Sequence, residues 1–254
     1  MKLKKILINT TPINRMYIGT DVVLGSTPPG STLINGVTSY YKFDETSGTV
    51  ASDSVGSIDG TLTQGSFTSG SIINNGVYFP TAGSAGQGIT YGNNFNFISG
   101  QASTYNVWLN SETIGNNVML MTKGSDYYYF LPSMNKVEIN ARHISAATKI
   151  QANFNYTFVA SEWYMFTLAR NGGNDITDWV HYINGVETPW TNVIQNNLDG
   201  DSGGASTFQL GEYINNAMNP QGYIDEFGVW DRQLSQSEIT ELYNDSAGKQ
   251  YPFA

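Results

Sequence analysis

The chain of 254 residues carries 12 Lys and Arg against 21 Asp and Glu, and this net charge of -9 excludes nucleic acid as a partner, because few phosphates could be neutralised. The sequence has no cysteine, which excludes disulfides and thiol catalysis. No stretch approaches the roughly 18 to 20 apolar residues that cross a bilayer, so membrane insertion is not expected.

Residues 1–32 are expected to form a β-arm that is separate from the rest of the chain. The apolar run Ile6 to Ile8 is far shorter than the roughly 7 to 15 residues of a signal sequence, which predicts no secretion signal. Pro28 and Pro29 cannot continue a strand ladder, so a linker over residues 26–31 ends the arm. Strands separated by turns are predicted within the arm at 4–8, 16–18 and 22–24.

Residues 33–254 are expected to form one all-β domain, because the 27 glycines, the 16 tyrosines and a charged fraction of only 13% favour short strands and turns over helices. Asn184-Gly185 predicts a two-residue hairpin turn. Regular alternation of strand and turn signals is typical of a sandwich. Strands are predicted at 33–43, 60–63, 76–79, 88–91, 105–109, 117–123, 127–131, 136–141, 156–159, 163–170, 178–183, 208–213 and 222–230.

Residues 221–239 read as a strand that leads directly into a short helix. Alternation with a period of two puts Asp225, Phe227 and Val229 on one face of the strand. Ser235, followed three residues later by Glu238, is a capping box and predicts the start of the helix.

This order of features resembles the C-terminal signature of the laminin-G-like, concanavalin-A-like jelly-roll domains, in which a G-x-I-D-E strand precedes an arginine, Leu-Ser and a Glu-Ile helix. The resemblance implies a two-sheet antiparallel jelly-roll sandwich with one short C-terminal helix. It extends over about residues 38–245, because further pieces of the family pattern occur in the expected order at 41–45, 53–56, 60–62, 76–79, 107–108, 163–166, 180–185 and 208–211.

Residues 13–23 resemble short segments of bacteriophage virion and tail-associated proteins. This resemblance implies a virion surface protein, such as a capsid decoration, head fibre or tail-associated protein, that contacts other virion proteins through residues 1–30 and is a homo-oligomer or present in many copies. The alternative for the arm is an extra hairpin packed on the sandwich. The alternative for the whole chain is a secreted or cell-surface bacterial lectin-like module.

The acidic residues do not form a pattern for catalysis, so the chain is not expected to be an enzyme. Asp44-Glu45 and Asp225-Glu226 are adjacent residues, whose side chains point to opposite faces of a regular strand, so neither dipeptide presents two acids to one glycosidic bond. His181 alternates within a strand and is expected to belong to a sheet face. A polysaccharide-active enzyme with acids from different strands ranks third.

A structural Ca²⁺ is often held in jelly rolls of this superfamily by the aspartate of the last strand, which the resemblance maps onto Asp225. Asp53 is a second, weaker candidate. Ca²⁺ takes oxygen ligands, about six to eight of them. The alternative is that Asp225 only accepts hydrogen bonds at a strand end.

Aromatic side chains divide into core residues and residues beside turns. Sugars stack on exposed rings and are oriented by amide side chains, so the aromatic and Asn residues beside turns are the candidate contacts for surface glycans. Contact with a neighbouring subunit is the alternative for these rings. The candidate ligand contacts are Trp190, Tyr213, Tyr128, Asn192 and Asn215, and the predicted core residues are Phe43, Phe79, Trp108, Phe166 and Phe227.

Overall fold

The computed structural model describes residues 16–18, 21–24, 30–124, 126–131, 135–143, 148–202, 204–212 and 218–253. Contacts divide the chain into Met1–Thr32, together with Ala254, and Leu33–Phe253. In the first unit, β1 (Met16–Ile18) pairs antiparallel with β2 (Asp21–Leu24). The strand predicted at 4–8 lies outside the described residues.

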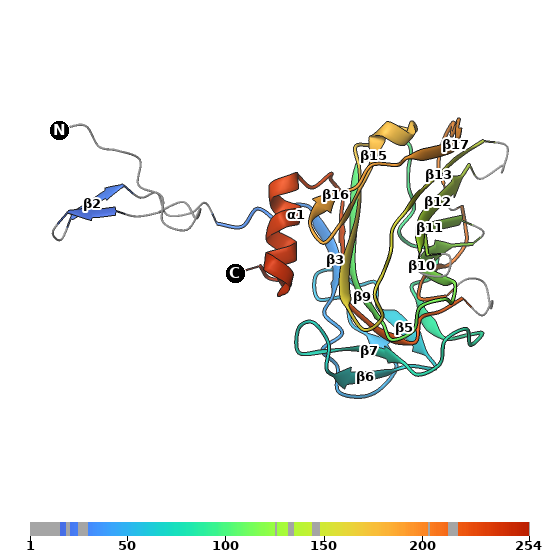
Figure 1. Cartoon of the computed structure of the whole chain (residues 1–254), viewed down its shortest axis with the longest axis horizontal. Helices are drawn as coiled ribbons and strands as arrows, with labels where there is room; N and C mark the ends of the chain where they lie inside the picture. Colours follow the sequence, from blue (N-terminus) through green and yellow to red (C-terminus); the bar gives the residue numbers. More distant parts are fainter. Residues whose placement is uncertain are drawn as a thin grey trace. The chain divides into compact units, whose positions relative to one another are not determined.

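The second unit is a sandwich of two antiparallel sheets, as predicted (Figure 1). The described part of the nine-stranded sheet has the order β17 (Asn192–Asn196), β13 (Lys149–Asn155), β12 (Lys136–Arg142), β11 (Asp126–Leu131), β10 (Val118–Lys123), β18 (Phe208–Leu210), β8 (Gly88–Thr90), β5 (Gly60–Thr63), β4 (Val50–Ala51). The eight-stranded sheet has the order β16 (Val186–Glu187), β15 (Trp179–Ile183), β14 (Trp163–Arg170), β9 (Ser103–Ser111), β19 (Gly222–Trp230), β7 (Asn75–Phe79), β6 (Ser66–Ser69), with β3 (Val37–Tyr41) also paired to β19.

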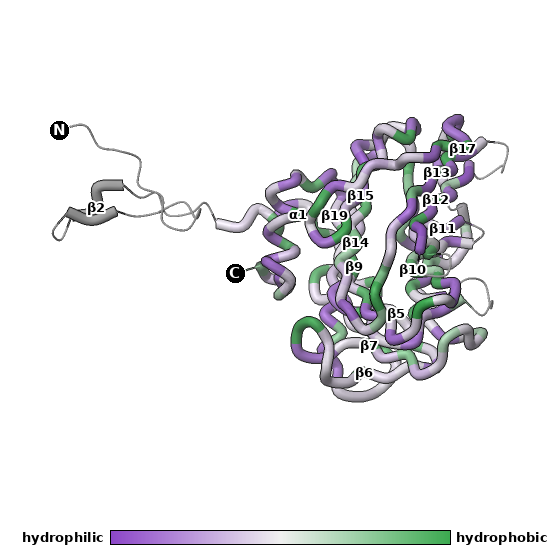
Figure 2. Tube along the Cα trace, in the orientation of Figure 1, coloured by the Kyte–Doolittle hydropathy of each residue, from purple (hydrophilic) through white to green (hydrophobic). Residues whose placement is uncertain are grey.

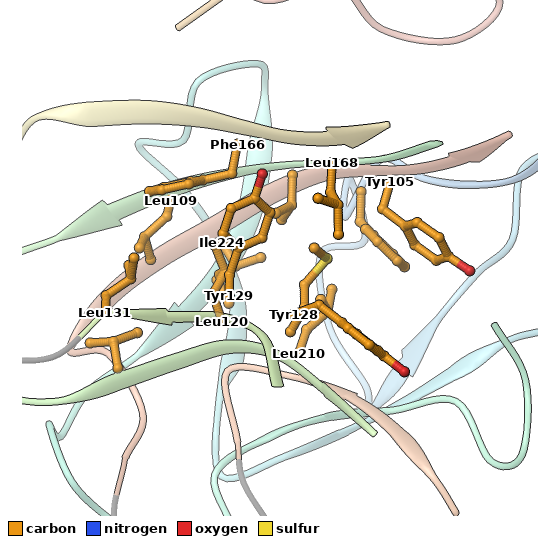
Figure 3. Close-up of a cluster of buried hydrophobic side chains, with 14 of the residues drawn as sticks. Tyr105, Leu109, Leu120, Tyr128, Tyr129, Leu131, Phe166, Leu168, Leu210 and Ile224 are labelled. Carbon is orange, nitrogen blue, oxygen red and sulfur yellow. The ribbon is translucent and has the colours of Figure 1, made fainter. Parts of the chain in front are cut away.

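The main core lies between the two sheets, because alternate side chains of each strand point inward. Figure 3 shows side chains of β9, β14 and β19 facing those of β10, β11 and β18. Purple and green segments alternate along many strands in Figure 2, as expected for strands with one buried face. The predicted core residues Phe43, Phe79, Phe166 and Phe227 are all confirmed in this layer.

A second apolar layer covers the outer face of the eight-stranded sheet, where α1 (Gln236–Tyr243) packs (Figure 1). The helix begins where the sequence predicts, because the Ser235 hydroxyl accepts the N–H of Glu238 and the Glu238 carboxylate accepts the N–H of Ser235. Trp108, predicted as core, is buried in this layer, and its ring stacks on Tyr243 of the helix with the centroids 5.7 Å apart. Within the described residues, no helix is long and apolar enough to cross a membrane.

The sequence predicts the hairpin turn of this domain more accurately than its polar strands. Asn184 and Gly185 have positive φ values of 53° and 77° and join β15 to β16, which confirms the hairpin turn. The strand predicted at 156–159 is wrong: these residues follow β13 as irregular chain. The strands β13 and β17 were missed, because their outward side chains are mainly amides and β17 is exposed along its whole length.

β19 contains a bulge that breaks the expected alternation. Its register with β9 shifts between Asp225 and Gly228, and Glu226 has a φ of 50°. The extra residue turns Ile224, rather than Asp225, into the inter-sheet core beside Phe227. The prediction that Asp225 shares a face with Phe227 is therefore wrong.

The bulge buries two adjacent carboxylates, with Asp225 at 0% exposure and Glu226 at 1%. Asp225 accepts the N–H groups of Ile73 at 3.2 Å and of Glu226 at 2.9 Å, while Glu226 accepts from Gln250 at 2.6 Å. Burial raises the pKa of Glu226 to about 8. Burial and the nearby Glu226 charge hold the pKa of Asp225 well above its usual value. The charge of Glu226 thus acts on its neighbour Asp225.

Replacing Glu226 by Gln is expected to reduce the loss of stability on going from pH 6.5 to pH 8. Between its usual pKa of 4.5 and about 8, folded Glu226 holds a proton that the unfolded chain has lost, so the free energy of unfolding falls as pH rises. His181, with its pKa lowered from 6.5 to about 3, has the opposite effect, which declines through pH 6.5 as the unfolded chain loses this proton. Urea denaturation at a series of pH values measures the slope, at most about 1.4 kcal/mol per pH unit for one proton.

The exposed Glu162 provides the matched control, since Glu162→Gln should leave the slope unchanged. Asp225→Asn should lessen the slope in the same direction as Glu226→Gln, because the folded-state pKa of Asp225 is also raised. A wild-type stability that is equal at pH 6.5 and pH 8 would contradict the expectation.

Candidate functional site

A pocket of about 330 Å³ lies where the chain passes from one sheet to the other between β16 and β17. Its walls are the 3-10 turn η2 (Ile176–Asp178), the first half of β15 and the connection to β17. We call it the Trp190 pocket. It is lined by Ile176, Thr177, Trp179, Val180, His181, Glu187, Thr188, Pro189, Trp190 and Val193.

Trp190 is half-buried and held in place from two sides. Its indole N–H donates to the carbonyl of Trp179 at 2.8 Å. Its ring centroid lies 4.5 Å from that of His181 and 5.7 Å from that of Phe154, which belongs to the other sheet. The ring is therefore positioned before any ligand arrives, which reduces the entropy cost of binding.

His181 lines the Trp190 pocket, with its ring next to that of Trp190. It is 0% exposed and stacks on Phe154 with the ring centroids 4.4 Å apart. Neither ring nitrogen has a hydrogen-bond partner among the described residues. Burial lowers the pKa of His181 to about 3, so the ring is neutral at physiological pH and a weak base. The expectation that His181 belongs to a sheet face is confirmed.

The rim of the Trp190 pocket is polar. Thr177 and Glu187 are exposed, and Thr188 is half-buried beside them. The Thr177 hydroxyl donates to Asp175 at 2.8 Å, so its lone pairs remain available to a ligand donor. Apolar walls with a few oriented polar groups are typical of a small-molecule site.

Of the pocket residues, the sequence predicted Trp190 and missed the rest. Thr177 and Trp179 come from η2 and the start of β15, about ten residues before Trp190, and only the fold brings them together. Glu187 could have been found, because it lies two residues after Gly185 of the hairpin turn and three residues before Trp190.

The other predicted ligand contacts lie elsewhere. Asn192 is exposed, and its amide donates to Asn153 at 3.3 Å on the nine-stranded sheet. The prediction that Tyr128 is an exposed ring beside a turn is wrong. Tyr128 is 0% exposed in the main core, where its hydroxyl lies 3.3 Å from that of Ser202. The register of β11 shifts near this residue, which lets two successive tyrosines point inward. Tyr213 and Asn215 lie outside the described residues.

The carboxylates of the two predicted calcium ligands already accept hydrogen bonds from backbone N–H groups. Asp225 accepts the two N–H groups described above, and Asp53 accepts those of Tyr40, Val55, Gly56 and Ile58 at 3.0 to 3.3 Å. Among the described residues, no three His, Cys, Asp or Glu side chains gather as a metal site. These donor sets therefore do not fit Ca²⁺ as they stand, and calcium stays a prediction.

Replacing Asp225 by Ala measures the role of its carboxylate. If Ca²⁺ is bound there, the loss in Tm is larger with calcium than after chelation, because the ion stabilises only the folded state. Thermal denaturation with CaCl2 and with EDTA makes the comparison, and Glu162→Ala is the exposed control. Equal losses in both buffers would leave Asp225 as a hydrogen-bond acceptor only.

No curated protein matches the chain in sequence. Among solved structures, the chain is similar to domain 4 of an extracellular arabinanase from Geobacillus stearothermophilus in complex with arabinotriose, with 18% identity, a TM-score of 0.53 and coverage of 81% of this chain and 97% of that one. It is also similar to the binding domain of Paraclostridial Mosquitocidal Protein 1, with 16% identity, a TM-score of 0.63 and coverage of 85% and 53%.

A third similar structure is a mutant of Trypanosoma rangeli sialidase with trans-sialidase activity, with 13% identity, a TM-score of 0.60 and coverage of 89% of this chain and 35% of that one. The chain thus spans about half of the mosquitocidal fragment and about a third of the sialidase. At these identities the likeness concerns the fold. Residues 81–240, more than half of the chain, match a family directly, and the chain belongs to the Concanavalin A-like lectin/glucanases superfamily.

Proposed function

We propose that the sandwich is a non-catalytic glycan-binding module that takes a sugar residue in the Trp190 pocket. The observation that carries this proposal is the half-buried Trp190 ring in a pocket of about 330 Å³ with hydroxyls and a carboxylate on its rim. An apolar sugar face packs on an indole ring, while the sugar hydroxyls bond to polar groups around it. The arabinanase domain in complex with arabinotriose, which has the same fold, supports a glycan as ligand.

The ligand is a neutral sugar rather than an acidic one. Among the described residues that line the pocket, Glu187 is the one charged group, since burial keeps His181 neutral. A carboxylated sugar would meet the Glu187 charge with no Lys or Arg of the lining to compensate it. The formal charge of -9 adds repulsion at longer range.

The same residues support the proposal of binding without hydrolysis. Glycoside hydrolysis uses two carboxylic groups on either side of the scissile bond. Glu187 supplies one carboxylate, and the described lining of the pocket offers no second. His181, with a pKa of about 3, is too weak a base to take its place near neutral pH.

Replacing Trp190 by Ala is expected to weaken glycan binding about tenfold or more, because it removes the stacking surface. A glycan array probed with multimerised protein first ranks neutral against uronic-acid and sialic-acid glycans, and arabinotriose is a defined probe for titration. Single-site affinity should be modest, with a Kd on the order of 0.1 to 1 mM.

Trp163→Ala is the matched control, since Trp163 is also half-buried but lies outside the pocket and packs against Tyr223. No retained glycan on the array would remove the lectin function. A preference for sialic or uronic acids would contradict the neutral ligand, and shortened oligosaccharides after incubation would mean that the protein is an enzyme.

We further propose that the chain is a bacteriophage virion surface protein, with the sandwich displayed and residues 1–30 attached to the particle. The support is the resemblance of residues 13–23 to virion and tail-associated proteins and the separation of residues 1–32 from the sandwich as a contact unit. Many copies on a particle would turn modest single-site affinity into firm attachment through avidity. A secreted or cell-surface lectin-like module is the alternative location.

Deleting residues 1–30 should abolish incorporation into particles and leave the sandwich folded, because Leu33–Phe253 contains both apolar clusters. Mass spectrometry of purified particles measures incorporation, and circular dichroism with a thermal melt measures folding. A truncated protein that still co-purifies with particles would show that the arm is not the anchor. Absence of the full-length chain from particles would favour the secreted module.

A further inference from the structure

A second pocket, of about 200 Å³, lies at the end of the eight-stranded sheet where β9 begins and β19 ends. We call it the Asn96 pocket. Its apolar wall is made by aromatic and aliphatic residues, and its rim is richer in polar side chains than that of the Trp190 pocket. The lining consists of Thr38, Phe95, Asn96, Ile98, Gln101, Ala102, Ser103, Tyr105, Val229, Trp230 and Asp231.

Two polar atoms in the wall lack a partner. The side-chain oxygens of Asn96 and Ser103 are both buried without a hydrogen bond among the described residues. An unpaired buried polar group costs about 1 to 3 kcal/mol, so two of them beside one cavity are unusual. Both side chains are only half-buried as a whole, and both residues line the cavity.

The loop that carries Asn96 is held by groups outside the pocket. The buried Arg170 guanidinium donates to the carbonyl of Ile98 at 2.8 Å. The N–H of Ser99 donates to the Asp201 carboxylate at 2.7 Å, and the N–H of Gly100 to the carbonyl of Gly172 at 2.9 Å. The cavity is therefore a fixed feature of the fold.

Phe95, directly before Asn96, has a φ of 58°, a conformation that is rare for an aromatic residue. The ring is held by edge contacts to Phe208 at 5.2 Å and Phe227 at 5.9 Å between the centroids. Strained backbone of this kind persists where surrounding packing imposes it, and it often occurs at functional sites. Here it forms part of the pocket wall next to the unpaired oxygen of Asn96.

We propose that the Asn96 pocket is a second sugar subsite, which binds a neutral polyhydroxylated ring through Asn96, Ser103, Gln101 and Asp231. This inference rests on the proposed glycan-binding function. Amide, hydroxyl and carboxylate oxygens accept from sugar hydroxyls, whereas an apolar ligand would leave these groups unpaired. Among the described lining residues, no Lys or Arg is present to attract an anion, and Asp231 would repel one.

The two pockets lie near the same end of the eight-stranded sheet. Ser103 of the Asn96 pocket pairs with Arg170 on β14, and Arg170 pairs in turn with Trp179 of the Trp190 pocket. These lining residues are thus two strand spacings apart, on the order of 10 Å. Sugar residues of one short oligosaccharide, or of two neighbouring chains, could occupy both pockets.

Titration followed by ¹H–¹⁵N NMR tests the second subsite residue by residue. The probes are the methyl glycosides of arabinose, glucose, galactose and mannose, added to the full chain. We expect amides of 96–103 and 229–231 to shift together with those of 177–193. Asn96→Leu and Ser103→Val should each weaken the binding seen at 96–103 and 229–231 at least fivefold and leave the binding seen at 177–193 unchanged. Trp190→Ala should weaken the binding seen at 177–193 and leave the binding seen at 96–103 and 229–231 unchanged.

Thermal melts separate a ligand role from a structural one. Asn96→Leu and Ser103→Val remove an unpaired buried group, so their Tm should equal or exceed that of the wild type. Shifts confined to 177–193 would overturn the second subsite and leave the proposed function intact, while shifts in neither set would overturn both. A lowered Tm in these variants with undiminished shifts at 96–103 would also overturn the inference, because the two side chains would then be structural.

Discussion

The buried guanidinium of Arg170 is the interaction on which both pockets depend. This side chain is 1% exposed, and among the described residues it donates to backbone carbonyls and one side-chain amide oxygen. Its charge also lies over the Trp179 ring, 4.9 Å from the centroid. Burying a charge is costly unless its donors are satisfied, and here one planar group satisfies the carbonyls of two loops at once. The acceptors are Ile98, Gly172, Gly173 and Asn174.

This arrangement shows how a two-sheet sandwich can carry sites without disturbing its core. The aromatic layer between the sheets is continuous and holds the strands in register, while the ends of β9, β14 and β15 carry the irregular chain. Arg170 stands at the last position of β14, so it connects the regular pairing of the sheet to the loops beyond it. Loop residues are thereby bonded to the end of a strand, and a binding site needs such support.

Local chemistry in the sequence predicts much of the fold and little of the site. Ser235 with Glu238 and Asn184 with Gly185 specify a helix start and a turn through contacts between near neighbours, so both were predictable. The bulge at Glu226 was not, because it depends on how β19 meets β9.

The same distinction applies to the binding residues. Trp190 could be predicted as a ligand contact because it is an aromatic residue beside a turn. Trp179 and Thr177, which line the same pocket, come from a separate segment that lies next to Trp190 only in the folded chain. Tyr128 shows the opposite error, since a run of tyrosines near a turn looks exposed until the register of β11 is known. Asn96 and Ser103 carry no signal in the sequence, because an unpaired atom is a property of packing.

The carboxylates buried by the β19 bulge have a calorimetric consequence. The folded chain holds Glu226 protonated at neutral pH, whereas the unfolded chain releases that proton to the solution. The proton is taken up by the buffer, so the heat absorbed on unfolding includes the protonation enthalpy of the buffer, which is its ionisation enthalpy with the sign reversed. Unfolding enthalpies of this domain measured in phosphate and in Tris therefore differ even at the same pH and the same transition temperature.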